Sequence, residues 1–452
     1  MADLDVLTLT ATEAQQLLRN QKLTSVALVE AYLTQIGKHN HNGFRLNALI
    51  SVAPREDLLK TASRLDEERA AGHARGPLHG IPFIIKDVFV TLPSLGMPTT
   101  CGTPCFAKAT TKRTAPLIQY LLDQGMILLG KANLTEFCGL KFKGLTPGYS
   151  SFGGQTQNPY IFGGLEKDEK LIGHSSPGGS SAGSAAGVAA GFAPLSIGTE
   201  CCGSIITPAN RAGLYALKCG LHTVDDEGCF KYNDCIDCIG GLAKSAQDLA
   251  SFIAALQQRK EPYDLNRGLA GLRVGFTDVN VWRLPETMVS WPGDTRQQME
   301  DGYSAAIATL KANGVDVETD IDLPRAEEYM KRPDGKSHFW EIAMHQLKQT
   351  HMQAFFDEFS ESEVHSLEEM IEWNKKHADT CLPQDELEGL LASNREPAEM
   401  EAMIIELRDK SKSALDRHFE AGMDIVVALA DSSLVRYSSG AGKPVFFLIR
   451  TA

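Results

Sequence analysis

The chain has 452 residues, of which 43% are hydrophobic and 22% are charged, a composition typical of a folded globular protein. Its formal net charge of −13 argues against nucleic acid and anionic membranes as main partners, because both bind basic surfaces. No apolar run reaches the roughly 18 residues of a membrane-spanning helix, and the length allows about two or three domains or one large α/β domain.

The N-terminal part, residues 1–75, is predicted to be helical. Residues 10–37 form two helices, and Thr10 followed by Glu13 is the pattern of a capping box at the start of the first. Residues 55–72 form a third, charged amphipathic helix. The chain starts without the basic segment and long apolar run of a secretory signal, so we expect a cytoplasmic protein.

Ten cysteines are present, and in a cytoplasmic protein we expect them to be reduced thiols rather than a disulfide framework. Cys235 and Cys238 form a CxxC pair that Cys219 or Cys229 could extend toward a zinc site. Because no histidine pattern supports such a site, structural thiols are the favoured interpretation. We expect neither a metal nor an organic cofactor.

Residues 76–250 alternate short apolar strands with helices, which favours a parallel or mixed sheet covered by helices. The expected elements are a strand at 83–85, a helix at 114–124, a strand at 126–130 and a buried helix that runs into a strand over 185–197. Residues 144–183 are almost entirely loop, and long loops inside a compact domain are usually functional or disordered.

The C-terminal half has a different sequence pattern. A linker over 261–275 leads into a strand. Charged, helix-rich stretches follow over 296–315 and 338–420, within a variable part that spans 261–420. Residues 421–452 form a C-terminal strand region, in which 424–430 are expected to be a buried strand. We expect all parts to belong to a single domain over residues 1–452.

Four glycines recur at every fourth position, Gly179, Gly183, Gly187 and Gly191. On a helix this spacing leaves a bare stripe that lets another backbone come close. The segment is too short to be a membrane-spanning dimerisation helix. Close packing inside the core is therefore expected.

Three residues carry the candidate chemistry. Lys86 ends the apolar run 81–85, and burial of an amine disfavours its charged form, so such a lysine can accept a proton from a hydroxyl. Ser204 follows Gly203 in a turn whose successive N–H groups can surround an oxyanion. Ser180 lies 24 residues before Ser204, where its hydroxyl can relay a proton between the other two residues.

Each of these residues also has a plain structural interpretation. Lys86 can reach the surface along its apolar stem or pair with Asp87. Ser180 can cap the helix that follows it. Ser204 can lie in an ordinary Gly-Ser turn.

Two other site types match parts of the same region less well. The GSSAG sequence at 179–183 fits the nucleophile elbow of an α/β-hydrolase with Ser181 as nucleophile, but no strong strand precedes it. A phosphate-binding loop is disfavoured because the GxxxxGK[ST] motif is absent.

Together these segments resemble the amidase signature family. The matching blocks are GPLHGIPFIIKD at 76–87, GQTQNP at 154–159, SPGGSSAGSAAGVAAG at 176–191, GTECCGSIITPA at 198–209, GLYALK at 213–218 and GLAKSAQDLA at 241–250. The 24-residue spacing of the two serines also matches the family. The resemblance implies an α/β fold with a mixed central β-sheet surrounded by helices. It also implies hydrolysis of a carboxamide to a carboxylic acid and ammonia or an amine.

The resemblance also implies roles for individual residues. Lys86 would be the base, Ser180 a bridging serine with a cis peptide bond, and Ser204 the nucleophile that forms an acyl-enzyme. The oxyanion hole would be made by the backbone amides of Cys201, Cys202, Gly203 and Ser204.

The sequence departs from the family pattern in several places. Cys202, Ile206 and Ala182 stand where the family commonly has glycine, arginine and glycine. Family chains also continue beyond the segment that matches 442–448, whereas this C-terminus is short and ends at Ala452. A missing sheet edge or pocket wall is therefore expected, and the alternative to an active enzyme is a degraded, non-catalytic amidase-like protein with a binding role or none.

The expected partner is a small-molecule amide. Some members of the family amidate charged tRNA together with partner chains, but nothing here marks a tRNA surface and the acidic balance argues against one. The sequence resembles general amidases, including fungal ones, more than it resembles the members that amidate tRNA. A homodimer is one of the oligomeric states left open.

Overall fold

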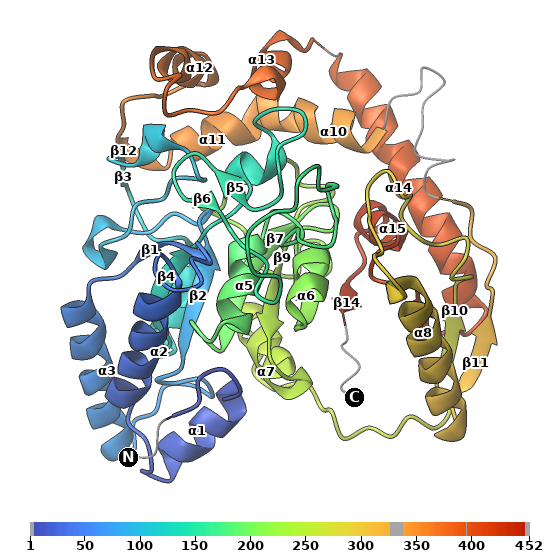
Figure 1. Cartoon of the computed structure of the whole chain (residues 1–452), viewed down its shortest axis with the longest axis horizontal. Coiled ribbons are helices and arrows are strands. Elements are labelled where there is room, and N and C mark those ends of the chain that lie inside the picture. The colour runs from blue at the N-terminus through green and yellow to red at the C-terminus, as the bar shows by residue number, and fades with distance from the viewer. Residues whose placement is uncertain (1–3, 326–337, 395, 448–452) are drawn as a thin grey trace.

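The computed structural model describes residues 4–325, 338–394 and 396–447. A seven-stranded sheet with the order β1-β4-β2-β7-β9-β8-β14 lies at its centre (Figure 1). Its strands are β1 (Leu49–Val52), β2 (Pro82–Lys86), β4 (Ile127–Ala132), β7 (Leu195–Glu200), β8 (Tyr215–Lys218), β9 (Cys238–Ala243) and β14 (Val445–Phe447). The neighbours β4, β2 and β7 are parallel and the other pairs are antiparallel, so the sheet is mixed, as the sequence predicted.

Helices cover both faces of this sheet. On β9, a Cβ added to Gly240 would meet Ile205, next to α6, whereas one added to Gly241 would meet Phe252 and Ile253 of α7. Because successive residues of a strand face opposite sides, α6 and α7 lie on opposite faces. The covering helices are α5 (Ala182–Ala189) and α6 (Ile206–Ala212) on one face, and α7 (Ala246–Leu256) with α4 (Pro116–Asp123) on the other.

The glycine stripe of α5 packs against the sheet, which confirms the prediction of close packing. A Cβ on Gly183 would lie 2.4 Å from the carbonyl oxygens of Ala48 and Asn133. A Cβ on Gly187 would lie 2.6 Å from the side chain of Ile84. Only glycine lets the helix come this near.

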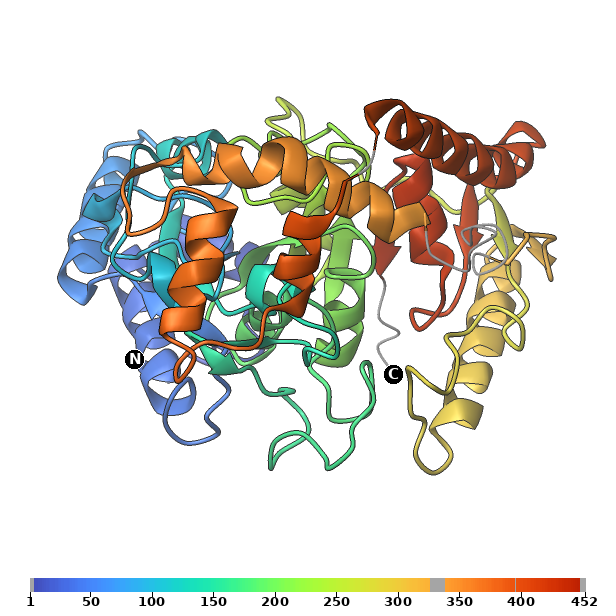
Figure 2. The same cartoon turned by 90° about the horizontal axis from the view of Figure 1, so that it is seen from above.

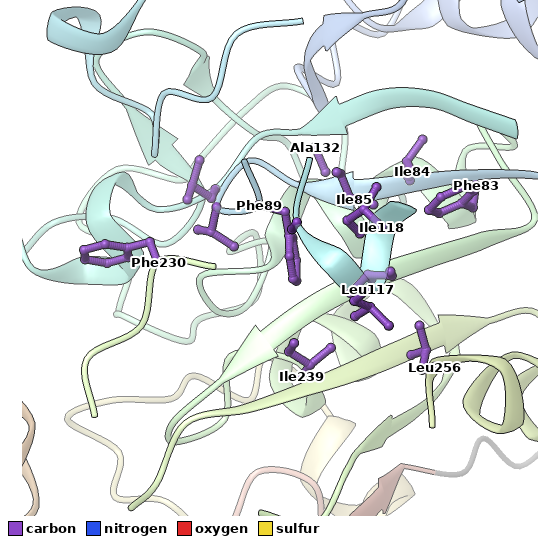
Figure 3. Packing of buried hydrophobic residues seen from close by; sticks show 14 of the residues in the cluster. Phe83, Ile84, Ile85, Phe89, Leu117, Ile118, Ala132, Phe230, Ile239 and Leu256 are labelled. Carbon is purple, nitrogen blue, oxygen red and sulfur yellow. The ribbon is translucent and has the colours of Figure 1, made fainter. Parts of the chain in front are cut away.

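The central sheet is buried throughout its middle. Every residue of β2, β4, β7 and β9 is buried, since both faces are covered. Figure 3 shows Leu117 and Ile118 of α4 with Ile85 and Ile239 of the sheet, all within one hydrophobic cluster. Lys86 is the last residue of β2, and it stands at the rim of this apolar packing.

The N-terminal helices follow the sequence prediction. They are α1 (Ala11–Arg19), α2 (Ser25–His39) and α3 (Arg55–Ala70). The capping box of Thr10 and Glu13 is present at the start of α1, and Thr24 caps α2.

A second, three-stranded sheet lies apart from the first. Its order is β11-β10-β13, all parallel, with β10 (Arg273–Phe276), β11 (Asp316–Thr319) and β13 (Ile425–Val427). The helix α8 (Thr295–Ala312) packs on it. Figures 1 and 2 both show this sheet at the end of the molecule opposite α1–α3.

The prediction of a buried strand over 424–430 is wrong in one respect. The strand β13 forms, but it is an edge strand of the small sheet and its residues are only partly covered, with Ile425 46% exposed. The apolar run predicted burial because strand sequence does not report how many faces are covered.

The predicted helix-rich stretch over 338–420 is confirmed. Its elements are α10 (His338–Gln346), the π-helical η4 (Leu347–His351), α11 (Met352–Phe356), β12 (Phe359–Glu361), α12 (Leu367–Lys376), α13 (Asp385–Ala392) and α14 (Pro397–Glu420), and α15 (Leu434–Ala441) follows. The remaining short elements are β3 (Thr110–Thr111), β5 (Tyr149–Ser150), β6 (Gly154–Gln155), and the 3₁₀ turns η1 (Pro93–Leu95), η2 (Pro104–Phe106) and η3 (Glu136–Gly139). Among the helices of the described ranges, none combines the length and hydropathy needed to cross a membrane.

Candidate active site

A pocket opens at the carboxyl ends of the parallel strands β2 and β7. Its lining residues are Cys138, Ser180, Thr199, Cys201, Ser204, Asp226, Cys229, Phe230, Lys231, Tyr232, Asp237, Cys238 and Ile239. Its empty volume, which includes solvent space at the mouth, is about 400 Å³. Two serines that the sequence singled out, Ser180 and Ser204, therefore share one pocket.

The amine of Lys86 lies directly behind this pocket. The side chain is completely buried, and its Nζ donates to Ser180 Oγ at 2.7 Å and to Thr199 Oγ1 at 2.9 Å. A third, longer contact of 3.4 Å joins Nζ to the carbonyl oxygen of Thr199. All three acceptors belong to neutral groups, so Lys86 neither reaches the surface nor pairs with Asp87.

Asp87 has a different partner. Its Oδ1 lies 3.5 Å from Lys131 Nζ, and both side chains are fully buried. Its Oδ2 accepts from the backbone N–H of Thr100 at 3.0 Å. Burial lowers the pKa of Lys131 to about 8, although the neighbouring carboxylate opposes the shift. The pair fastens β4 to the segment that follows Lys86 and so stabilises the end of β2.

The two serine-bearing turns lie in contact. The N–H of Ser181 donates to the carbonyl oxygen of Ser204 at 3.0 Å. A Cβ on Gly179 would lie 2.9 Å from Ser204 Cα, so glycine is needed for this approach. The expected cis peptide bond at Ser180 is not present, since the described residues contain no cis bond.

Ser181 does not lie in a nucleophile elbow. Its side chain is fully buried, donates to the carbonyl oxygen of Thr199 at 3.1 Å and accepts from the Thr199 N–H at 3.3 Å. The residues before it form loop with a single bridge between Ile172 and Val289, not the strand that an elbow follows. The α/β-hydrolase interpretation is therefore wrong.

A buried carboxylate shapes the loop over 201–204. Glu200 Oε2 accepts from the N–H groups of Ile205 at 2.6 Å and Ile206 at 2.9 Å, at the start of α6. Within the described ranges, the N–H groups of residues 201–204 have no acceptor in the protein. Ser204 itself is half-buried at the pocket wall.

Sequence reasoning missed Thr199 and Glu200. Both lie inside the GTECCGS block, two places and one place before the loop that carries Ser204. Thr199 was detectable as a polar residue near the end of a buried strand that leads to the candidate site. Its contact with Lys86 was not detectable, because 113 positions separate the two residues.

Residues 226–239 form the far wall of the pocket. Lys231 Nζ lies 2.9 Å from Asp226 Oδ2 and 2.7 Å from Asp234 Oδ1. Asp237 Oδ2 accepts from the N–H groups of Tyr232 at 2.6 Å and Asn233 at 2.9 Å. Burial raises the pKa of Asp237 to about 6, although these hydrogen bonds oppose the shift.

All ten cysteines are free thiols, including the CxxC pair Cys235 and Cys238. Among the residues that the structure describes, no group of three or more His, Cys, Asp or Glu side chains could hold a metal ion. The polar groups at the pocket are thus hydroxyls, amines, carboxylates and thiols.

Known proteins share sequence with most of this chain. A family model described as Amidase matches residues 27–430. A Schizosaccharomyces pombe protein that carries the word amidase in its name is 28% identical over 400 residues, which cover 82% of this chain and 63% of that protein. A glutamyl-tRNA(Gln) amidotransferase component from Neisseria meningitidis is 32% identical over 321 residues, which cover 68% of this chain and 58% of that relative. The match thus spans about three fifths of the length of these curated relatives.

Solved structures share the fold over nearly the whole chain. The peptide amidase of Stenotrophomonas maltophilia has a TM-score of 0.81 at 26% identity, covering 96% of this chain and 88% of that chain. An amidase family protein of Bacillus anthracis has a TM-score of 0.82 at 26% identity, covering 98% and 84% respectively.

Proposed function

The chain belongs to the Amidase family, and on that premise we propose that it hydrolyses a carboxamide through Lys86, Ser180 and Ser204. The observation that carries the proposal is the 2.7 Å hydrogen bond from buried Lys86 to Ser180, in a pocket that Ser204 also lines. The products would be a carboxylic acid and ammonia or an amine.

In the first half-reaction, Lys86 acts as the base and takes a proton from Ser180, which takes one from Ser204. The Ser204 oxygen attacks the amide carbon, and the carbonyl oxygen becomes an oxyanion. The N–H groups of residues 201–204, which have no acceptor among the described residues, would bind that oxyanion. Stabilisation of this kind is usually the largest single contribution to catalysis. The proton returns through Ser180 to the leaving nitrogen, and the C–N bond breaks.

In the second half-reaction, water replaces the departed amine. It gives its proton to the same relay and attacks the acyl-enzyme ester, which releases the acid and restores Ser204. The contacts of Lys86 support this route, because its amine bonds directly to the Ser180 hydroxyl from which it would take the proton.

Thr199 and Glu200 act as positioning residues in this proposal. Thr199 provides Lys86 with a second hydroxyl partner beside Ser180 and so limits the rotamers of the amine. Glu200 binds two backbone N–H groups and so holds the loop over 201–204 open toward the pocket.

The test measures ammonia or amine release from aliphatic, aryl and fatty amides. Ser204→Ala and Lys86→Ala are expected to lose activity by on the order of 10⁴-fold or more, since removing one member of a nucleophile–base unit disables the unit. The matched control is Ser184→Ala, whose buried hydroxyl bonds to the carbonyl oxygen of Ile197 but does not line the pocket, and it should keep activity within a few-fold.

A fluorophosphonate probe tests the nucleophile without knowledge of the substrate. Labelling of the wild type that disappears in folded Ser204→Ala supports the proposal. A folded wild type that neither reacts with the probe nor hydrolyses any amide of the panel would instead support a non-catalytic amidase-like protein.

A further inference from the structure

The pocket holds a cluster of thiols that the proposed mechanism does not use. Cys138, Cys201, Cys229 and Cys238 all line it, from chain segments that are far apart in the sequence. All four are free thiols. A pocket with four sulfur atoms in its wall is open to chemistry specific to thiols.

The four thiols differ in access. Cys201 and Cys238 are buried, whereas Cys138 and Cys229 are partly exposed. Burial raises the pKa of the Cys201 and Cys229 thiols well above the ordinary range, and Cys229 Sγ donates to the carbonyl oxygen of Phe230 at 3.4 Å. Since the thiolate is the nucleophile, these thiols react poorly, which leaves Cys138 as the accessible one.

Cys138 is held at the pocket wall by its neighbours in η3. The N–H of Phe137 donates to the carbonyl oxygen of Cys101 at 3.0 Å, and its carbonyl oxygen accepts from Tyr232 at 2.6 Å. The ring of Phe137 also packs edge-on against Phe230 at 5.5 Å between centroids. The turn is thus fastened to the wall over 226–239, and Cys138 stays at the pocket lining.

We propose that this thiol cluster is a modification site, at which Cys138 forms a mixed disulfide with small disulfides or thiosulfonates. The thiol first loses its proton to solvent. The thiolate then attacks one sulfur of the reagent, a new S–S bond forms, and the old bond breaks with its electron pair leaving on the departing thiolate or sulfinate. No further oxidant is needed, and a thiol reductant reverses the step.

The consequence for catalysis rests on the proposed function. Cys138 and Ser204 line the same pocket, so a CH₃S group on Cys138 takes up space on the way to Ser204. An amide or a serine-directed probe then cannot reach Ser204. The enzyme is inhibited by such thiol-modifying reagents and recovers on reduction.

The experiment treats the full chain with methyl methanethiosulfonate and follows two readouts. Peptide mass mapping reports which cysteines carry CH₃S, and the fluorophosphonate probe reports access to Ser204. In the wild type, probe labelling is expected to fall about tenfold or more as Cys138 is modified, because Cys138 and Ser204 line the same pocket, and dithiothreitol should restore it.

Two variants separate Cys138 from the other thiols. Cys138→Ser should keep its probe labelling during treatment. The matched control Cys381→Ser, which removes a partly exposed cysteine outside the pocket, should lose labelling as the wild type does. Thermal unfolding shows whether each variant is folded, and Cys138→Ala replaces Cys138→Ser if the latter is not. If neither folds, the parallel time courses of modification and labelling in the wild type decide.

The proposal is overturned if Cys138 stays unmodified while Cys381 reacts, or if labelling persists after Cys138 is modified. It is also overturned if Cys138→Ser loses labelling as fully as the wild type. When the untreated wild type is not labelled at all, the proposed function fails, and the mass mapping alone then decides the modification site.

Discussion

The two sheets of this protein both contain parallel strands and pack against helices, but they differ in how deeply their strands are buried. The central sheet has covered faces, and β2 and β7 are buried at every residue. The small sheet is also built on parallel strands and also carries a helix, α8, yet its edge strand β11 is largely exposed and its edge strand β13 is only partly covered. The candidate site lies wholly on the central sheet and its loops. A fully buried amine such as Lys86 requires strands that are buried on both faces, as β2 is and the edge strands of the small sheet are not.

The two regions should differ most in how much stability is lost when an ion pair is broken. Asp87→Ala leaves Lys131 buried without its carboxylate, and we expect a loss of about 3–5 kcal/mol in the free energy of unfolding. In the small sheet, Arg273 and Asp316 form an ion pair of 3.1 Å with side chains that are 41% and 70% exposed. Asp316→Ala should change stability too little to measure, because exposed pairs are screened by water.

Urea unfolding of the two variants beside the wild type makes this measurement. If Asp87→Ala and Asp316→Ala lower the free energy of unfolding equally, the difference in burial between the two ion pairs does not determine their contribution to stability. Asp87→Asn serves as the conservative control, since it keeps an acceptor for Thr100.

Two glycine-to-alanine substitutions should change the stability of the protein in opposite directions. Gly183→Ala in α5 places a Cβ 2.4 Å from two carbonyl oxygens, so we expect a destabilisation of about 3 kcal/mol. Gly302→Ala in α8 meets nothing within 4 Å and should stabilise the protein by about 0.5–1 kcal/mol, the helix preference of alanine over glycine.

Thermal unfolding reports both changes of this pair. A tolerated Gly183→Ala would contradict the close contact of α5 with the sheet. A destabilising Gly302→Ala would contradict the open space around Gly302 on α8.

The smallest effect is a pH dependence at the pocket wall. The folded pKa of Asp237 is about 6 against an ordinary 3.8, so between these values the folded form binds more protons than the unfolded form. Its contribution to stability is therefore largest below about pH 4 and is lost as pH rises toward 6. Because the side chain is partly exposed, we expect the loss to be about 1 kcal/mol.

Asp237→Asn should remove this part of the pH dependence while keeping an acceptor for Tyr232 and Asn233. Chemical unfolding at about pH 4.5 and about pH 6.5, on either side of the folded pKa, gives the difference. Asp316→Asn in the small sheet is the control that behaves as the wild type. Equal slopes for Asp237→Asn and the wild type would show that this carboxyl is not buried in solution.

Much of the fold followed from local sequence. The N-terminal helices, the strand that ends at Lys86 and the helix with the glycine stripe were predicted, because caps, apolar runs and periodic glycines act over a few residues. Strand β13 was misjudged, since an apolar run predicts a strand but not whether one face or two are covered.

By itself, the sequence determined which residues are candidates. Lys86, Ser180 and Ser204 each end an apolar run or lie in a glycine-rich turn, and such signals are contained in short segments. Only the tertiary structure decided their partners: Ser180 and Thr199 for Lys86, Lys131 for Asp87, and the wall over 226–239 for the pocket. The physical reason is that each partner is many residues away in the chain, and a contact between distant segments depends on how sheet and helices pack.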